Sequence, residues 1–120
     1  MRRNSVIEAV CEAALHGYWR GTGEPDGPID AVEFIQSQRR DVVHSMPRMM
    51  AMFLFRYRLK WSLNQIGTAT CRNHATVLHG IRVIEDEMSI DKTLRRAIRM
   101  ANELLDEREE IMESELMAND

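Results

Sequence analysis

The stretch SLNQIGTATCRNHATVLHG, residues 62–80, contains two helix starts, Ser62 and Asn73, that stand eleven residues apart. Ser62 and Gln65 stand three positions apart, which is the capping-box pattern of a helix N-terminus. Leu63, Ile66 and Ala69 then fall on one face of a short helix, as the core-facing side chains of an amphipathic helix do. The stretch therefore opens with a short capped helix over residues 62–70.

A second helix is predicted to open at Asn73, which is a favoured N-cap residue, and to run through about Met88. A short helix, a tight turn and a second helix make a helix-turn-helix. In that motif the first residues of the second helix meet base edges in the major groove of DNA. We therefore predict four base-contacting residues: Asn73, His74, Ala75 and Thr76. Arg72, just before the helix, is placed to bind phosphate.

Other interpretations of the same stretch are weaker. Cys71, His74 and His79 could be written as C-x2-H-x4-H, but two His five apart point in different directions on a helix. No second cysteine pair follows at a zinc-finger distance. A cysteine nucleophile would lack an acid nearby to orient the histidine, and the chain has no G-x-x-x-x-G-K-[ST] phosphate loop. A capped helix start with solvated polar side chains remains the plain alternative.

The rest of the chain predicts further helices and no strand. Helices are expected over about Ser5–Tyr18, from Asp30 through about Arg40, over residues 45–60 with Pro47 near the start, and from about Asp91 onward. Four Gly and two Pro in residues 17–28 predict a mobile loop near 19–29. We expect an all-α compact multi-helix bundle, with a helical domain over 1–102 and an acidic helix end or tail over 103–120.

Size and composition set the broad class. The 120 residues suit one domain, and 6% aromatic residues with nine Met favour a helical core. Two cysteines make no disulfide framework, and no signal peptide opens the chain, so we expect a cytoplasmic setting. The longest apolar run, residues 49–55, is too short to span a bilayer, so no membrane partner is expected.

The formal charge of −3 hides two opposite segments. Residues 39–82 hold eight cations against Asp41 alone, a net charge of +7. Residues 103–120 hold eight acids against Arg108, a net charge of −7. Of the 16 cations 14 are Arg, the residue best suited to phosphate and guanine. Beside Arg72, the candidate phosphate contacts are Arg48, Ser62, Arg39, Arg40 and Lys60.

Three separate elements of residues 47–86 also resemble a known family. Arg72, His74 and Thr76–His79 resemble the R-D-H-[ST]-T-V-x-H-A string of the C-terminal DNA-binding domain of the bacterial replication initiator DnaA. The P-R-x-x-A-M element is matched by Pro47, Arg48, Ala51 and Met52, and S-L-x-x-I-G by Ser62, Leu63, Ile66 and Gly67. The resemblance covers about residues 30–90 and implies an all-helical, Trp-repressor-like helix-turn-helix fold that binds a short duplex box.

The departures from this family concern the residues that would read the bases. Asn73 stands where the family has an acid, and Ala75 where it has a hydroxyl residue. Asn pairs with adenine whereas an acid accepts from cytosine, so the box is expected to differ. The turn is one residue shorter, with Thr70 and Cys71 in place of glycines. Met46 replaces an Arg that enters the minor groove, and Arg39 or Arg40 could take over its role.

We therefore expect sequence-specific binding of double-stranded DNA, in replication control or transcriptional regulation. The family's ATPase module does not fit within 120 residues, so no enzyme activity and no cofactor are expected. A second hypothesis is an interaction module that has kept the fold but lost the readout. It would bind another protein or a second copy through the acidic C-terminal helix.

Overall fold

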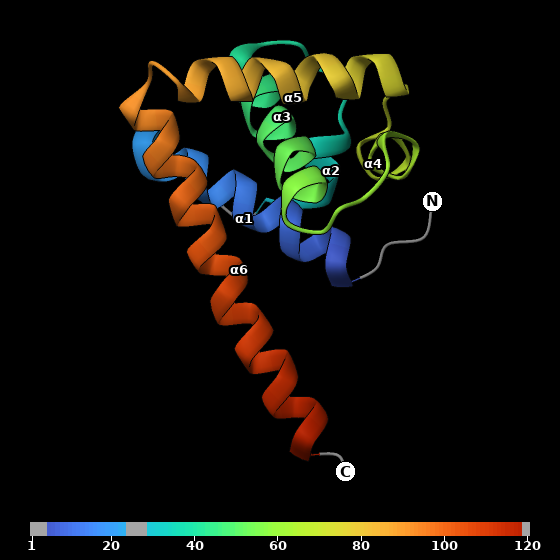
Figure 1. Cartoon of the computed structure of the whole chain (residues 1–120), viewed down its shortest axis with the longest axis vertical. Helices are drawn as coiled ribbons and strands as arrows, with labels where there is room; N and C mark the ends of the chain where they lie inside the picture. Colours follow the sequence, from blue (N-terminus) through green and yellow to red (C-terminus); the bar gives the residue numbers. More distant parts are fainter. Residues whose placement is uncertain (1–4, 24–28, 119–120) are drawn as a thin grey trace.

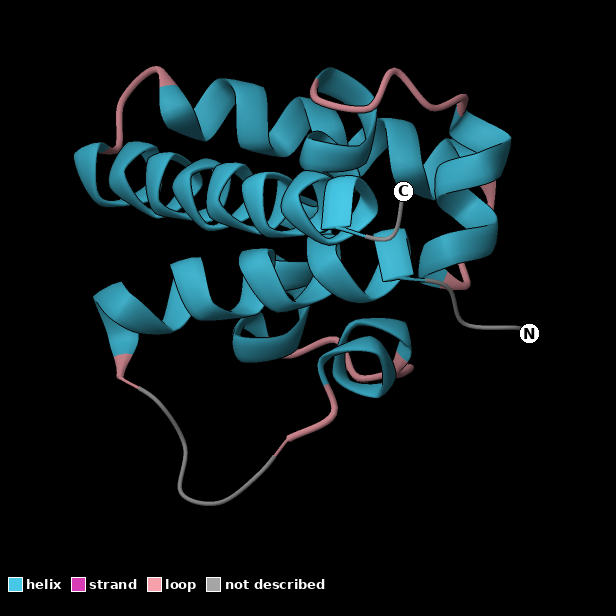
Figure 2. Ribbon diagram, turned by 90° about the horizontal axis from the view of Figure 1, so that it is seen from below, coloured by secondary structure: helices cyan, strands magenta, loops and turns pink. Residues whose placement is uncertain are grey.

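The computed structural model describes residues 5–23 and 29–118, and their side chains except those of 21–22 and 110–118. The described residues form six helices and no strand. The helices are α1 (Ser5–Thr22), α2 (Ala31–Gln36), α3 (Val42–Tyr57), α4 (Leu63–Thr70), α5 (His74–Met88) and α6 (Lys92–Ala118). Five of them form a compact body (Figure 2), and the second half of α6 extends away from it (Figure 1). The predicted all-α class is confirmed.

Helix α3 lies at the centre of the body, as its apolar sequence predicts. Met50, Ala51, Leu54 and Phe55 are at most 1% exposed, and α3 packs against α1, α2, α4 and α5. A helix that is apolar on nearly every side must be covered from several directions, which explains its central place. The helices of the helix-turn-helix, α4 and α5, are thereby fixed to one rigid core.

Helices α1 and α6 form the other half of the core. Leu94, Ile98, Ala101 and Leu105 form a buried stripe along α6. At Gly17 the two helices approach so closely that a Cβ atom would lie 2.6 Å from the carbonyl oxygen of Ala97. Helix α1 runs through Gly21 to Thr22, four residues beyond the predicted end at Tyr18, and Trp19 in this extension packs against Phe34 of α2. Tertiary packing outweighs the low helix propensity of glycine there.

The predicted loop near 19–29 therefore begins later than expected. Trp19 belongs to α1 and is only 7% exposed, so it packs into the core. Residues 24–28, the remainder of this prediction, lie outside the part of the chain that the structure describes.

The sequence misplaced two helix boundaries around residues 37–47. Helix α2 ends at Gln36, four residues before the predicted end, and α3 begins at Val42, before Pro47. Val42 is 61% exposed, so the first turn of α3 has no amphipathic pattern by which the sequence could reveal it. Pro47 lies inside α3 rather than at its start. The end of α2 follows from bonds made by Arg48, described below.

Helix α6 carries cations near its start and acids near its end, which opposes the helix dipole. Contacts with the body support it. Arg58 donates to Asp106 at 2.7 Å and lies 3.2 Å from Glu109, and Arg108 donates to Glu12 of α1. Within the described residues, no helix has both the length and the apolar character that crossing a membrane requires.

Candidate nucleic-acid interface

Both helices of the helix-turn-helix begin at the predicted caps. The Ser62 hydroxyl accepts from the Gln65 amide at 3.1 Å, and the Ser62 amide donates to Gln65 Oε1 at 2.8 Å. Asn73 Oδ1 accepts from the Thr76 amide at 2.9 Å and caps α5. These caps satisfy amides that a helix start leaves without partners. Asn73 therefore acts as an N-cap, whatever else it contacts.

The turn between α4 and α5 is made by three residues, 71–73. Cys71 adopts the left-handed conformation, with φ 57° and ψ 45°, which ends α4. The amides of Cys71 and Arg72 both donate to the carbonyl oxygen of Gly67. Gly67 has no space for a side chain, because a Cβ atom there would overlap the carbonyl oxygen of Arg72. Gly67 and the αL residue together make the sharp turn that this shorter sequence needs.

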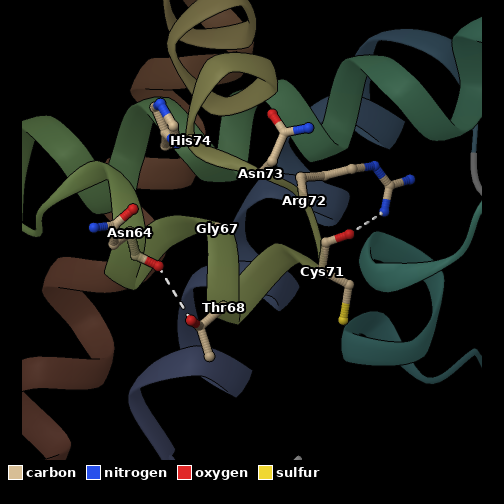
Figure 3. Close-up of a pocket in the computed structure, with 7 residues that line it drawn as sticks. All are labelled: Asn64, Gly67, Thr68, Cys71, Arg72, Asn73 and His74. Atoms are coloured by element: carbon tan, nitrogen blue, oxygen red, sulfur yellow. Dashed lines mark hydrogen bonds between the residues drawn. The ribbon is translucent and has the colours of Figure 1, made fainter.

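The first turn of α5 presents its polar side chains to solvent. His74, Ala75 and Thr76 are exposed, whereas Val77 is fully buried and anchors the helix to the core. A cavity of about 580 Å³ opens beside them, between α4 and the turn (Figure 3). It is lined by Asn64, Gly67, Thr68, Cys71, Arg72, Asn73 and His74. The predicted reading residues are thus accessible on one edge of the body.

Arg72 lies at the turn with its guanidinium directed toward the loop after α2. It donates to the carbonyl oxygen of Ser37 at 2.6 Å and to that of Cys71 at 3.0 Å. These bonds bring the loop containing Arg39 and Arg40 next to the turn, although the two segments are more than 30 residues apart. The result is a cationic edge beside the first turn of α5.

Arg48 has a different environment from the one predicted. It is only 5% exposed, and its guanidinium donates to the carbonyl oxygens of Ile35, Ser37 and Arg39 at 2.8–2.9 Å. Burial, and then the nearby charge of Arg72, lower its pKa to about 10. These bonds take up carbonyls that a longer α2 would have used, which explains why that helix stops at Gln36. The placement favours a structural role for Arg48.

The remaining predicted phosphate contacts are exposed. Arg39 donates to Asp41 at 3.1 Å, and Arg40 projects from the same loop. Lys60 adopts a left-handed conformation with φ 61°, two residues before Ser62 at the start of α4. These cations therefore lie near the two ends of α4, Arg39 and Arg40 near its C-terminus and Lys60 near its N-terminus.

Three polar residues at this site were not singled out by the sequence reasoning. Asn64 and Thr68 line the cavity from the outward face of α4, and Gln36 Nε2 donates to the carbonyl oxygen of Ala69 at 3.0 Å. Leu63, Ile66 and Ala69 mark the buried face of α4, so the opposite face, with Asn64 and Thr68, could have been predicted to be exposed. No sequence pattern marks the contact of Gln36. Within the described residues, no group of three or more His, Cys, Asp or Glu could hold a metal ion.

Comparison with known proteins agrees with this geometry. The family model for the bacterial DnaA protein helix-turn-helix matches residues 31–84, from the start of α2 to Ile84, the last buried residue of α5. Residues 31–84 belong to this DnaA helix-turn-helix family. The matched segment includes both caps, the turn and the cationic loop. The predicted resemblance is confirmed.

Several chromosomal replication initiator proteins DnaA are similar to this chain. That of Thermomicrobium roseum is 42% identical over 96 residues, 79% of this chain, and that of Methylacidiphilum infernorum 43% over 70 residues, 58% of this chain. That of Desulfotalea psychrophila is 36% identical over 73 residues, 61% of this chain. The matches cover only 15–18% of these relatives' own length. The search of solved structures found no significant match.

Proposed function

We propose that this DnaA-type domain binds double-stranded DNA and reads a short sequence with the first turn of α5. The observation that carries the proposal is the exposed set His74, Ala75 and Thr76 on a helix start held rigidly by Val77 and the Asn73 cap. In helix-turn-helix proteins this part of the second helix enters the major groove. His74 and Thr76 supply hydrogen-bonding groups, and Ala75 can touch a thymine methyl group.

Phosphate contacts would set the position of the duplex and supply most of the affinity. Arg39, Arg40 and Arg72 offer cations on one side of α4, and Lys60 with the start of α4 offers a second group on the other side. Ser62 is exposed at that helix start, where amides and hydroxyls bind phosphate. We leave Arg48 out of this set because it is only 5% exposed and its guanidinium is bonded to three carbonyls, whereas Arg72 is half-buried and lies at the surface of the turn.

We propose a role in replication control or transcriptional regulation, since the relatives' name refers to initiation of chromosome replication. The 120 residues contain no phosphate-binding loop of the G-x-x-x-x-G-K-[ST] type, so we assign them no ATP hydrolysis. We propose that the protein acts in the cytoplasm by occupying its site on DNA, which requires only the DNA-binding surface.

Equilibrium binding to a duplex over a range of salt concentrations tests the phosphate contacts. We expect affinity to fall steeply with salt, and Arg40→Gln to flatten the logarithmic slope by about one unit on every sequence. Arg20→Gln is the matched control, because Arg20 is near the end of α1, far from α4 (Figure 1), and it should leave the slope unchanged. Equal slopes for both variants would remove Arg40 from the interface.

The readout by α5 is tested separately. On the preferred duplex we expect His74→Ala and Thr76→Ala each to cost about 1–3 kcal/mol of binding free energy. Each change should relax the preference at one base position, because a lost base contact affects only that position. Equal losses on every duplex would instead make these residues general contacts, and the assignment as readers would be wrong.

A further inference from the structure

The outward face of α6 has a charge pattern that DNA reading does not use. Opposite the buried stripe of α6 lie Lys92, Arg96 and Arg99, followed by Glu103 and Glu107, all of them exposed. Their spacing of three or four residues places them along one side of the helix. We call these five residues the outer stripe. It is positive over its first two turns and negative after them.

The body of the protein gives the outer stripe no partner. Among the side chains that the structure describes, none forms a salt bridge with a residue of the outer stripe. Lys92 and Arg96, and again Glu103 and Glu107, are like charges four residues apart, which destabilises a helix. The positive start and negative end also oppose the helix dipole. Within one chain, Arg99 and Glu103 are the only opposite charges of the outer stripe that stand three or four residues apart, so most of this arrangement costs free energy.

A second α6 running in the opposite direction would complement Arg96, Arg99, Glu103 and Glu107, four of the five charges of the outer stripe. The positive part of one helix would then face the negative part of the other, and the two helix dipoles would be antiparallel. The distances match as well, because Arg96–Arg99 and Glu103–Glu107 are each about one helical turn long. Arg99 would meet Glu103 of the second copy, and Arg96 would meet its Glu107.

The shape of the molecule leaves room for such a pairing. Helix α6 has 27 residues and extends beyond the body, so its outer side is not covered by another element (Figure 1). The midpoint between Arg99 and Glu103 lies near Ala101, which is buried on the opposite face of α6. A two-fold axis beside that point would place the two bodies on opposite sides of the helix pair, because each body lies against the inner face of its own α6.

We propose that the outer stripe of α6 is a self-association surface whose partner is the α6 of a second copy, paired antiparallel by charge. Two copies would then carry two DNA-reading edges in one assembly. Exposed ion pairs are individually weak and are screened by salt, so the association is expected at high protein and low salt concentration. The inference does not depend on DNA binding, and it can be tested without DNA.

Sedimentation equilibrium of the full chain gives the first test. At about 50 mM salt we expect an average mass above the 13.9 kDa of one copy, and at about 500 mM salt a return to one copy. A mass of one copy at both salt concentrations and at high protein concentration would overturn the proposal. Association that is unchanged by salt would also overturn it, because an apolar surface would then be responsible.

Charge reversal tests the pairing itself. Arg96→Glu with Arg99→Glu makes the stripe almost wholly acidic, and Glu103→Arg with Glu107→Arg makes it wholly basic. Each double variant alone should remain a single copy, whereas an equimolar mixture of the two should associate at least as well as the unchanged chain. Because the mixture restores association, loss in the separate variants cannot be ascribed to misfolding. No association in the mixture would contradict the antiparallel pairing.

The alternative role of the positive half of the outer stripe, Lys92, Arg96 and Arg99, is nucleic-acid binding. If the variant with Arg96→Glu and Arg99→Glu lost duplex affinity while the unchanged chain stayed a single copy, the outer stripe would be a DNA contact instead. That outcome would overturn the self-association surface and leave the α5 readout intact, so the two proposals fail separately.

Discussion

At the scale of single residues, the carbonyl oxygen of Ser37 organises the site. Arg48 and Arg72 both donate to it, at 2.8 Å and 2.6 Å, although Arg48 belongs to α3 and Arg72 to the turn between α4 and α5. The sequence predicted both as cations at the interface, and it could not show which carbonyls lie within their reach. The set of carbonyls within reach depends on where α2 ends, and the hydrogen bonds of Arg48 help to end α2 at Gln36.

The role of Arg48 can be separated from phosphate binding by comparing two substitutions. We expect Arg48→Met to lower the free energy of unfolding by about 2–3 kcal/mol, because three carbonyls lose a charged donor. Arg40→Met, in the neighbouring loop, should stay within about 0.5 kcal/mol. Urea unfolding of the two variants measures this. A stable Arg48→Met variant with weakened DNA binding would restore Arg48 to the phosphate contacts.

Cys71 lies in a conformation that favours glycine. With φ at 57° the backbone is strained in any residue that has a Cβ atom. Cys71→Gly should therefore raise the free energy of unfolding by about 1 kcal/mol. Cys71→Ala keeps a Cβ and should leave the stability nearly unchanged, which makes it the control for loss of the thiol. Thermal unfolding of both variants checks the prediction. An equal gain for both would show that backbone strain is not the cause.

Asp41 makes stability depend on pH. The hydrogen bond from His44, at 2.8 Å, is the main cause that holds the Asp41 pKa below its ordinary value of 3.8, and Arg39 adds to it. A carboxyl group with a lowered folded pKa stabilises the fold above its unfolded pKa, and the contribution is lost as the pH falls through the folded pKa. We expect His44→Ala to raise the Asp41 pKa in an NMR titration. An unchanged Asp41 pKa would mean that His44 is not its partner.

At the scale of elements, helix starts could be predicted better than helix ends. The caps at Ser62 and Asn73 and the inward faces of α4 and α5 follow from spacing, because a cap and a stripe are local patterns. The end of α2 and the extension of α1 depend on contacts with distant residues, so no local pattern reveals them. The first turn of α5 was accordingly predictable, whereas its supporting loop was not.

The turn between α4 and α5 depends on Gly67. A methyl group there would overlap the backbone carbonyl of Arg72, so Gly67→Ala should lower the free energy of unfolding by about 2 kcal/mol and weaken duplex binding by shifting α5. Gly80→Ala is the matched control inside α5. Its added methyl meets only the flexible side chains of Met52 and Met49, at 2.7 and 3.0 Å. Unfolding and duplex titrations that do not distinguish the two variants would contradict the role of Gly67.

At the scale of the whole molecule, charge is divided along the chain. Residues 39–82, which include α4 and the turn after it, carry a net charge of +7, and residues 103–120 carry −7. Composition revealed this division, but it could not show that Arg58 ties Asp106 and Glu109 to the body. Under the two proposals, this division keeps the acids of α6 away from the DNA-binding edge and leaves the outer stripe to a second copy.

The central claim is that the first turn of α5 reads a DNA sequence, and selection from a random duplex pool tests it most directly. The full chain would be incubated with the pool at near-physiological salt, and the bound fraction would be sequenced. We predict enrichment of one short box, differing from the family's box where Asn73 and Ala75 replace an acid and a hydroxyl residue. Binding without enrichment of any sequence, weak and steeply dependent on salt, would contradict the claim and leave only a general cationic edge.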